Sequence, residues 1–548
     1  MEHWVERLAR KVEEEFGDRG ILVCNGGLSV SGLQHVGRLR GEVTIKDSVA
    51  RALKEKGFEV ESTLVLYTMD PWRGKEAQLK QFERKEEALN YIGLPLDLVP
   101  DPYGCHDNWV EHYWEDFGNY LGEFSSPTKI VTTRELYSSN IRMKEFVKLA
   151  VGRKREEVLN LLNKYRGRKP YPKEWIPFQP ICGKCKRIDS TKTLEVDLVN
   201  GKVKYVCTNC GYEGIADLSE GKLMWRLEWV GVWYALKVAF EPYGKDHATP
   251  GGSRDSCNEL ALKVFGFKPP VGVAYEWVGY AKRGKDLGDM GSSDFIGFTP
   301  KDWLEVAEAE VLRFIYLYNA PLKRIVLSME RVPSYVDLYD KAERVYYGVE
   351  KLSDRGEEEK VIKSFTYANL KPLPKELPFK LPYLHAVALI QVVPPNGNIV
   401  EEALRRVKAT KLLERELSPE EVEGVKIRLL KARSWLEKYA PETYKIRVLE
   451  EVNEELVKKV GTREAELIAE LYTNLIKLRS WDEKSIKEAM VKVRKGGRDE
   501  EVKFFKALYL AFFGREYGPR IAPYFSILGR DFVLDRLRKL LKIKGILS

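Results

Sequence analysis

The sequence predicts an α/β protein that ends in an all-helical part. The α/β prediction depends on two junctions, at residues 21–40 and 237–256, where a strand-like run meets a glycine-rich turn and then a helix. From about Ala403 onward, apolar residues recur at three- and four-residue steps, which is typical of amphipathic helices. A chain of 548 residues is long enough to form several domains.

The first junction has the features of a phosphate-binding turn. The run ILVCNGG leads into SVSGLQHVGRLR, residues 29–40, where free backbone N–H groups and the positive end of a helix dipole converge. The small residues Ser31 and Gly32 let a base or ribose approach the backbone, and we expect His35 to face the phosphates. Neither a P-loop nor a GxGxxG motif is present, so an ordinary strand-to-helix turn is the alternative interpretation.

Composition favours a folded protein of several domains without a membrane segment. Hydrophobic residues make up 44% of the chain and charged residues 32%, which indicates a surface with many ion pairs. Residues 1–20 predict an acidic amphipathic helix, and no apolar run reaches membrane-spanning length, so we expect a soluble cytoplasmic protein. The net charge of +9 is compatible with a polyanionic partner but does not require one.

Two CxxC pairs predict a zinc ribbon. Cys182 and Cys185 are followed after 21 residues by Cys207 and Cys210, and the intervening LEVDLVNGKVKYV predicts a hairpin with an Asn-Gly turn. Knuckles at the ends of such a hairpin bring four thiolates into a tetrahedron. Two disulfides are the alternative, but we find no secretory signal, and seven cysteines would leave an odd thiol.

A second candidate metal site lies in DPYGCHDNWVEH, residues 101–112. Asp101, Cys105, His106 and His112 can reach one metal ion if the turn at residues 102–104 folds back onto the following helix. A surface helix with unrelated polar residues is the alternative interpretation.

The second junction carries acidic and imidazole groups at the end of a strand. The preceding MWRLEWVGVWYALKVAF is interpreted as β-rich and leads into Gly244, Asp246 and His247, with a helix expected from near Ser253. We expect both junctions to open onto one cleft. Further along, a strand and a Gly/Ser/Lys-rich loop precede a helix capped at Thr299.

The C-terminal half predicts a helical bundle with basic clusters. VKIRLLKARSWLEKYA and EVKFFKALYLAFFG have helical periodicity and are joined to their neighbours by polar turns. The basic residues of KVRKGGR and LDRLRKLLKIKG can contact an RNA backbone or, alternatively, form a solvated helical face. The first cluster consists of Lys492, Arg494, Lys495 and Arg498.

Several motifs together resemble one enzyme family. They are SGLQHVG, PDPYGCH, WRLEWV, FEPYGKDH, YEWVG and GREYGPRIAPYFSILGRDFVLDRLR. Over essentially its full length the sequence is similar to class I lysyl-tRNA synthetases, and HVGR resembles the HIGH signature of class I enzymes. The resemblance implies an α/β Rossmann-like class I synthetase catalytic domain with zinc-binding insertions, followed by an all-α C-terminal anticodon-binding domain.

The resemblance also implies five segments. Residues 1–170 would form the first part of the catalytic domain with a zinc-binding insertion, and residues 171–220 the zinc ribbon insertion. Residues 221–310 would complete the catalytic domain, 311–400 would be a stem-contact segment, and 401–548 the helical anticodon-binding domain.

The function that the resemblance implies is that of a lysine–tRNA ligase, which activates lysine with ATP to lysyl-adenylate and transfers it to tRNA(Lys). The implied partners are ATP, lysine and tRNA, with two Zn²⁺ ions and Mg²⁺ as cofactors, and we expect a monomer. Catalytic roles fall to His35, Gly37, Asp246 and His247. Nucleotide binding falls to Ser31, Gly32, Gly244, Met290, Ser292 and Ser293, lysine binding to Glu228, Trp229 and Trp233, and metal binding to Asp101, Cys105, His106, His112, Cys182, Cys185, Cys207 and Cys210.

One loop departs from the family pattern. Where class I enzymes have KMSKS, and this family KMSSSKG, two lysines hold the triphosphate during adenylation. Residues 289–294 here read DMGSSD, so an aspartate stands at both lysine positions. Lys282, Arg283 and Lys285 can substitute only if the loop shifts its register.

Three other positions differ from the family pattern. Asn25 stands where the family has an acidic residue, Arg38 replaces an asparagine, and Gly41 replaces a glutamate. Two alternatives to the ligase therefore stay open. One is a synthetase-like paralogue that binds tRNA or nucleotide without aminoacylation, and the other is a zinc-containing nucleotide-binding protein of a different kind.

Overall fold

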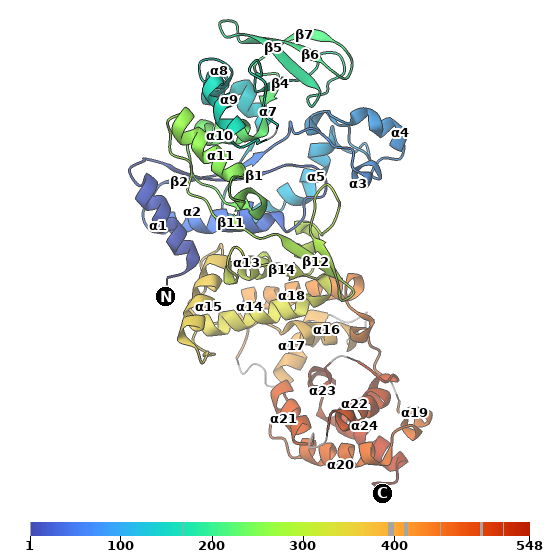
Figure 1. Cartoon of the computed structure of the whole chain (residues 1–548). Coiled ribbons are helices and arrows are strands. Elements are labelled where there is room, and N and C mark those ends of the chain that lie inside the picture. The colour runs from blue at the N-terminus through green and yellow to red at the C-terminus, as the bar shows by residue number, and fades with distance from the viewer. Residues whose placement is uncertain are drawn as a thin grey trace. The chain divides into compact units, whose positions relative to one another are not determined.

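The computed structural model describes residues 2–167, 169–392, 399–409, 415–449, 451–493, 497–518 and 520–547 (Figure 1). The chain forms two compact units, which are described separately. Unit 1 consists of Met1–Trp303, Glu308–Ser328 and Gly348–Leu373, and unit 2 of Leu304–Ala307, Met329–Tyr347 and Pro374–Ser548.

A parallel sheet forms the centre of unit 1. Its order is β3 (Lys129–Thr132), β2 (Val60–Leu66), β1 (Leu22–Leu28) and β9 (Val238–Phe240), and all neighbouring strands are parallel. Nearly all of β1 is buried, as is usual for a parallel strand covered on both faces. The predicted α/β fold is confirmed. The carboxyl ends of β1 and β9 meet at one edge, which is where sheets of this kind bind ligands.

Helices surround this sheet. The chain leaves β1 through a turn and enters a π-helix, Leu39–Ile45, which continues as α2 (Lys46–Glu55), so the helix expected after the first junction begins at Leu39. The other helices of unit 1 are α1 (Trp4–Phe16), α3 (Glu76–Leu79), α4 (Lys85–Ala88), α5 (Trp109–Gly118), α6 (Leu121–Phe124), α7 (Thr133–Ser139), α8 (Ile141–Val151), α9 (Arg155–Lys164), α10 (Trp225–Leu236), α11 (Ser253–Glu259), α12 (Pro300–Leu304, reaching into unit 2), α13 (Ala309–Tyr318) and α15 (Arg355–Ala368).

The segment that we interpreted as β-rich is mostly helical. Residues Trp225–Leu236 form α10, and only Val238–Phe240 form a strand. Because α10 is buried on almost every side, its apolar residues lack the one-sided spacing of an amphipathic helix. Its aromatic and β-branched composition is then indistinguishable from that of a buried strand, and the β-rich interpretation was wrong for this reason.

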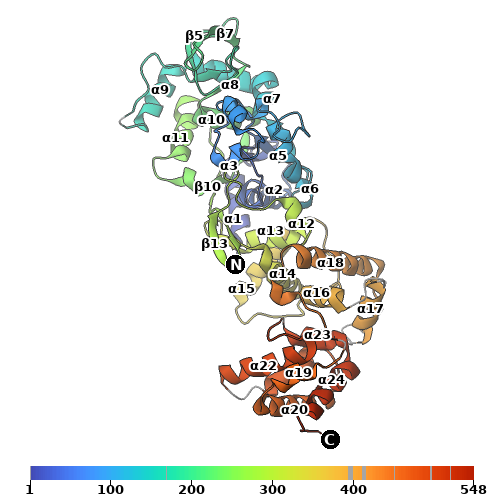
Figure 2. The same cartoon turned by 90° about the vertical axis from the view of Figure 1, so that its right-hand side faces the viewer.

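The cysteine pairs lie in a small antiparallel region, residues 178–223, which we call the ribbon. It contains β5 (Thr191–Asp197), β6 (Lys202–Cys207) and β7 (Glu213–Asp217), while β4 (Phe178–Pro180) pairs with β8 (Gly221–Leu223). The predicted hairpin is confirmed, with Gly201 of its turn at a φ of +66°. Figures 1 and 2 both show the β5–β7 sheet at one end of unit 1, close to α8.

Short strands follow the second junction. β10 (Tyr243–Gly244) pairs with β11 (Ala274–Tyr275), and β12 (Val278–Lys282) lies between β13 (Lys285–Asp289) and β14 (Ile325–Leu327). The expected helices are present at Ser253 and after Thr299, whose hydroxyl accepts the backbone N–H of Asp302.

All the regular elements described in unit 2 are helices, and the helical bundle predicted from about Ala403 onward is confirmed. α16 packs against α18 and α23, and α20 packs against α22 and α24. Its core includes Trp435, whose indole N–H donates to the carbonyl of Met329 at 2.8 Å. The helices of unit 2 are α14 (Val332–Tyr346), α16 (Tyr383–Val392), α17 (Ile399–Ala409), α18 (Pro419–Lys438), α19 (Glu454–Lys458), α20 (Thr462–Ile476), α21 (Glu483–Val493), α22 (Arg498–Phe513), α23 (Ile521–Leu528) and α24 (Arg530–Ile543).

The predicted basic cluster is described only in part. Lys492 lies near the end of α21 and Arg498 begins α22, whereas Arg494 and Lys495 lie outside the described residues. Within the described ranges, no helix combines the length and the apolar character needed to cross a bilayer.

Candidate active site and metal centres

One cavity of about 770 Å³ lies at the carboxyl ends of β1 and β9. The first junction contributes Gly27, Ser29 and Ser31 to its wall, and the second contributes Gly244 and His247. The two strand-to-helix corners therefore line a single cavity. Much of the rest of its wall comes from the ribbon, the segment before it and α10, and includes Tyr171, Trp175, Gln179, Asp189, Thr191, Lys192, Thr193, Lys222 and Trp225. The segment after β2 adds Asp70, Arg73 and Gln78, and Tyr275, Trp277 and Ser293 also line the cavity.

The structure divides the predicted site residues into two groups. Those that line the cavity are Ser31, Gly244, His247, Ser293, Glu228 and Trp229. Those that do not line it are Gly32, His35, Gly37, Asp246, Met290, Ser292 and Trp233, although most of them are neighbours of lining residues.

His35 differs most from its predicted position. Its side chain is only 4% exposed, and its Nδ1 has no hydrogen-bond partner among the described residues. The backbone at Gly297 packs against it, and the N–H of Val36 donates to Phe298. Burial holds the pKa of His35 well below its usual value, so the imidazole is neutral. The side chain does not line the cavity.

Gly32 serves loop packing in this structure. A Cβ at this position would collide with the carbonyl oxygen of Ser292 and with the ring of Phe295. The glycine therefore lets the 289–294 loop approach the end of β1, whereas the sequence suggested the approach of a base or ribose.

Glu228 is engaged inside the protein. Its carboxylate is 1% exposed, lies 2.8 Å from the ammonium of Lys222 and accepts a hydrogen bond from the hydroxyl of Tyr137 at 2.9 Å. Lys222 also lies 2.6 Å from Asp70. Because Lys222 already neutralises Glu228, this carboxylate is a poor candidate for binding the ammonium of a substrate.

Glu42 is a cavity residue that the sequence did not single out. Tyr275 donates its hydroxyl to Oε1 of Glu42, but Oε2 has no hydrogen-bond partner among the described residues. Burial raises the pKa of Glu42, although the positive charge of Arg38 and the hydrogen bond from Tyr275 act in the opposite direction. The neighbouring Gly41 makes room for the Tyr275 ring, since a Cβ there would collide with it. The one hint in the sequence was the glycine at position 41, next to Glu42, where the resemblance predicts a glutamate.

Both oxygens of a second buried carboxylate of the cavity accept a hydrogen bond. Glu241 accepts hydrogen bonds from the indole of Trp229 at 2.6 Å and from the amide of Asn25 at 2.8 Å. Trp229 thus positions Glu241 within the wall of the cavity. His247 lies beside the rings of Trp225 and Trp229, and burial lowers its pKa.

The 289–294 loop holds its aspartates in ion pairs. Asp294 binds the ammonium of Lys75 with both carboxylate oxygens at 3.1 Å. Asp289 lies 3.3 Å from the guanidinium of Arg324. Ser292 accepts a hydrogen bond from Nε of Arg38 at 3.4 Å.

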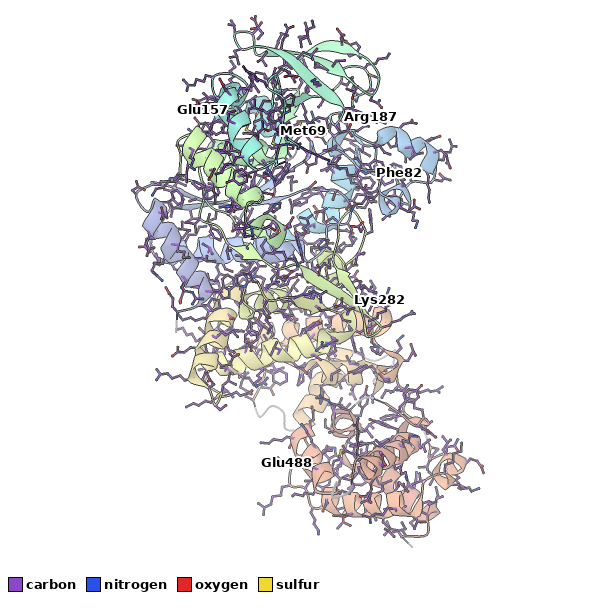
Figure 3. All side chains as sticks on the ribbon, in the orientation of Figure 1. Met69, Phe82, Glu157, Arg187, Lys282 and Glu488 are labelled. Atoms are coloured by element: carbon purple, nitrogen blue, oxygen red, sulfur yellow. The ribbon has the colours of Figure 1, made fainter. Side chains whose placement is uncertain are left out.

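The basic residues proposed as substitutes lie elsewhere. Lys282, Arg283 and Lys285 are exposed at the turn between β12 and β13 and do not line the cavity. Figure 3 labels Lys282 at this hairpin.

The CxxC pairs meet as a four-thiol cluster. The Sγ atoms of Cys182 and Cys210 are 3.7 Å apart, and those of Cys185 and Cys207 are 3.6 Å apart. A tetrahedral zinc site with Zn–S bonds of about 2.3 Å requires S–S edges of about 3.8 Å. All four ligand atoms lie within 4.8 Å of one another, so the cluster fits a zinc ion.

The second cluster also converges. Sγ of Cys105 lies 3.1 Å from Nδ1 of His106 and 3.3 Å from Nδ1 of His112, which is 3.1 Å from a carboxylate oxygen of Asp101. Asp101 also accepts backbone N–H groups from the turn that follows it, which folds that turn toward α5. The mixed set of nitrogen, sulfur and oxygen ligands suits zinc.

Comparison with known proteins identifies the family. Residues 2–370 match the family model described as tRNA synthetases class I (K), and residues 401–541 match an anticodon binding domain. The lysine–tRNA ligase of Aeropyrum pernix is 44% identical over 98% of this chain and 97% of the relative. The chain belongs to the class I lysine–tRNA ligase family. Two other lysine–tRNA ligases match over a similar length. The Pyrococcus horikoshii enzyme is 32% identical over 98% of this chain and 99% of the relative, and the Methanocaldococcus jannaschii enzyme is 30% identical over 97% of this chain and 99% of the relative.

Membership of this class I family confirms the predicted resemblance and fold class. The catalytic family model covers the parallel sheet, the ribbon and the cavity, and the anticodon-binding model covers helices of unit 2. In this chain the cavity is bordered by a loop, residues 289–294, that has an aspartate at each end and no lysine.

Proposed function

We propose that this chain is a lysine–tRNA ligase that activates lysine with ATP and transfers it to tRNA(Lys). The observation that carries the proposal is the single cavity, in which the end of β1, the second junction and the unpartnered oxygen of Glu42 come together. Family membership over nearly the whole length supports the same activity.

In the proposed first step, the carboxylate of lysine attacks the α-phosphate of ATP, and pyrophosphate leaves. Such a reaction requires positioning of the two substrates and stabilisation of negative charge on the phosphate oxygens. Ser29 and Ser31 offer hydroxyl and backbone groups at the end of β1, and Gly244 allows close approach from the second junction. Mg²⁺ is expected to accompany ATP. In the second step, the 3′ hydroxyl of the tRNA takes the lysyl group and AMP leaves.

For the amino acid, we assign the side-chain ammonium to Glu42. A buried carboxylate with one unpartnered oxygen gains a charge-assisted hydrogen bond when an ammonium group enters. Tyr275 fixes the orientation of this carboxylate. Trp229 remains a candidate wall of the pocket, and Glu241 is a second carboxylate that the α-amino group can reach. This assignment replaces Glu228, which Lys222 already neutralises.

The partner of unit 2 is proposed to be the tRNA, because its helices match an anticodon binding domain. Lys492 and Arg498 are candidate contacts to the phosphate backbone. The division of the chain into five segments stays our prediction, and so does the monomeric state.

The two ligand clusters are proposed to hold one zinc ion each. Cys182, Cys185, Cys207 and Cys210 would tie the ribbon together, and Asp101, Cys105, His106 and His112 would fix the turn before α5. In both places the metal would contribute to folding rather than to catalysis, because each site offers four protein ligands.

The direct test of the function is lysine-dependent exchange of labelled pyrophosphate into ATP, with each of the twenty amino acids in turn. Exchange with lysine alone, followed by charging of tRNA(Lys), is the expected result. A paralogue without ligase activity would instead bind tRNA in a salt-dependent manner and exchange with no amino acid. A folded protein that binds neither ATP nor tRNA would contradict both possibilities.

Metal analysis of the purified protein tests the zinc proposal without reference to activity. We expect two zinc ions per chain, one zinc ion after Cys207→Ser and one after His112→Ala, because each substitution removes a ligand from one cluster. Both variants should unfold at lower temperature. Cys257→Ser, which changes a buried thiol outside both clusters, is the matched control and should keep two ions. Zinc-free wild-type protein after expression in zinc-containing medium would refute the proposal.

A further inference from the structure

The 289–294 loop has no positive charge to offer a phosphate. Its two terminal aspartates are each paired with a cation from elsewhere in unit 1, Asp294 with Lys75 and Asp289 with Arg324. Arg324 is further engaged by Asp286 at 2.8 Å. If the cavity binds ATP, the charge that stabilises the triphosphate must come from another wall.

Besides His247, four basic side chains line the cavity, and two of them, Lys192 and Lys222, come from the ribbon. Lys222 is buried between Asp70 and Glu228, and Lys192 is on the ribbon strand β5. The other two are Arg38 and Arg73. Among the described residues, neither of these guanidinium groups has a carboxylate within ion-pair distance.

Both arginines belong to segments that meet at the phosphate-binding corner. Arg38 precedes the π-helix, and its Nε donates to Ser292 of the loop. Arg73 lies in the segment after β2, which is joined to the end of β1 by a hydrogen bond from Gln78 to the carbonyl of Ser31 at 2.8 Å. The same segment carries Lys75, which holds Asp294. The end of β1, the Arg73 segment and the loop therefore surround one corner of the cavity.

We propose that Arg38 and Arg73 bind the triphosphate of ATP and take over the role of the two lysines that the loop lacks. The proposal rests on the proposed function. When the lysine carboxylate bonds to the α-phosphorus, the bond to the bridging oxygen of the β-phosphate breaks, and the electron pair leaves with pyrophosphate. Guanidinium groups present paired donors that match phosphate oxygens, so both arginines stabilise the charge on this leaving group.

This arrangement also explains the asparagine-to-arginine difference at position 38. Arg38, at the start of the π-helix, supplies the positive charge that the loop lacks. The loop aspartates bind Lys75 and Arg324, and these ion pairs hold the loop in place. The loop then acts as a wall of the cavity through Ser293 and delivers no positive charge to the triphosphate.

Pyrophosphate exchange with lysine, measured as a function of ATP and of lysine, tests the proposal. We expect Arg38→Gln to lower kcat/KM for ATP by roughly 10²-fold, since one donor to a developing phosphate charge is lost. Arg73→Gln should lower it as well, and Arg38→Lys should retain more activity than Arg38→Gln. The KM for lysine should change less than about twofold, because neither arginine is assigned to the amino acid. Lys282→Gln, on the exposed hairpin, is the control and should match the wild type.

Equilibrium dialysis with ATP alone separates this proposal from the proposed function. Wild-type protein that binds ATP without exchanging any amino acid would overturn the ligase assignment, whereas weaker ATP binding by Arg38→Gln would still support the phosphate role. Wild-type kinetics for ATP in both glutamine variants, each with unchanged melting temperature and zinc content, would overturn the role of the arginines and leave the ligase assignment intact.

Discussion

Replacing Glu42 with glutamine is expected to lower kcat/KM for lysine roughly 10²- to 10³-fold while changing the KM for ATP little. Glutamine keeps the size of the side chain and can still accept the hydroxyl of Tyr275, but it removes the charge that faces the ammonium. A loss of this size corresponds to about 2.7–4.1 kcal/mol, which lies within the about 2–5 kcal/mol that losing one partner of a buried charge pair typically costs. Pyrophosphate exchange at varied lysine concentration measures the effect.

Glu228→Gln provides the comparison, because Glu228 was the carboxylate predicted from sequence. Its loss should reduce the stability of the protein, because Lys222 keeps only Asp70 as a counter-charge. It should lower kcat/KM for lysine less than Glu42→Gln does. The opposite ranking, with lysine recognition lost in Glu228→Gln and kept in Glu42→Gln, would return the ammonium site to α10. Glu61→Gln, on the exposed end of β2, is the surface control.

Substituting Asp47 with asparagine is expected to destabilise unit 1 by about 3–5 kcal/mol, because it leaves a buried guanidinium without its counter-charge. Asp47 on α2 lies 2.9 Å from Arg313 on α13, and both side chains are at most 1% exposed. Arg313 donates its remaining hydrogen bonds to the backbone carbonyls of Phe124, Tyr367 and Ala368, so the pair joins distant segments of unit 1.

Denaturant titration followed by tryptophan fluorescence measures this loss as a lower transition midpoint at unchanged slope. Asp116→Asn is the matched control, since it removes an exposed pair with Lys301 at 3.1 Å and should cost less than about 1 kcal/mol. Equal midpoints for Asp47→Asn and the control would show that the buried pair contributes no more than an exposed one.

The features that local sequence could predict are those made by residues close together in the chain. Both candidate metal clusters follow from spacing, because a hairpin returns Cys207 to Cys182 and a single turn returns His112 toward Asp101. Helices of unit 2 such as α20, α21 and α24 also follow from local periodicity, since each of these buries one face. The glycine-rich corner at the end of β1 belongs to the same class, as its strand, turn and helix are consecutive.

Only the tertiary structure decided the features that join distant segments. Glu42 meets Tyr275, Asp294 meets Lys75 and Asp289 meets Arg324, and no local pattern encodes these pairs. The burial of His35 depends on the backbone at Gly297, and α10 could not be recognised as a helix because neighbouring segments cover it on almost every side. Sequence thus determined which chemical groups the chain carries and how each turn or helix presents them. Folding determined which charges are neutralised and which remain available, because that depends on partners brought together through space.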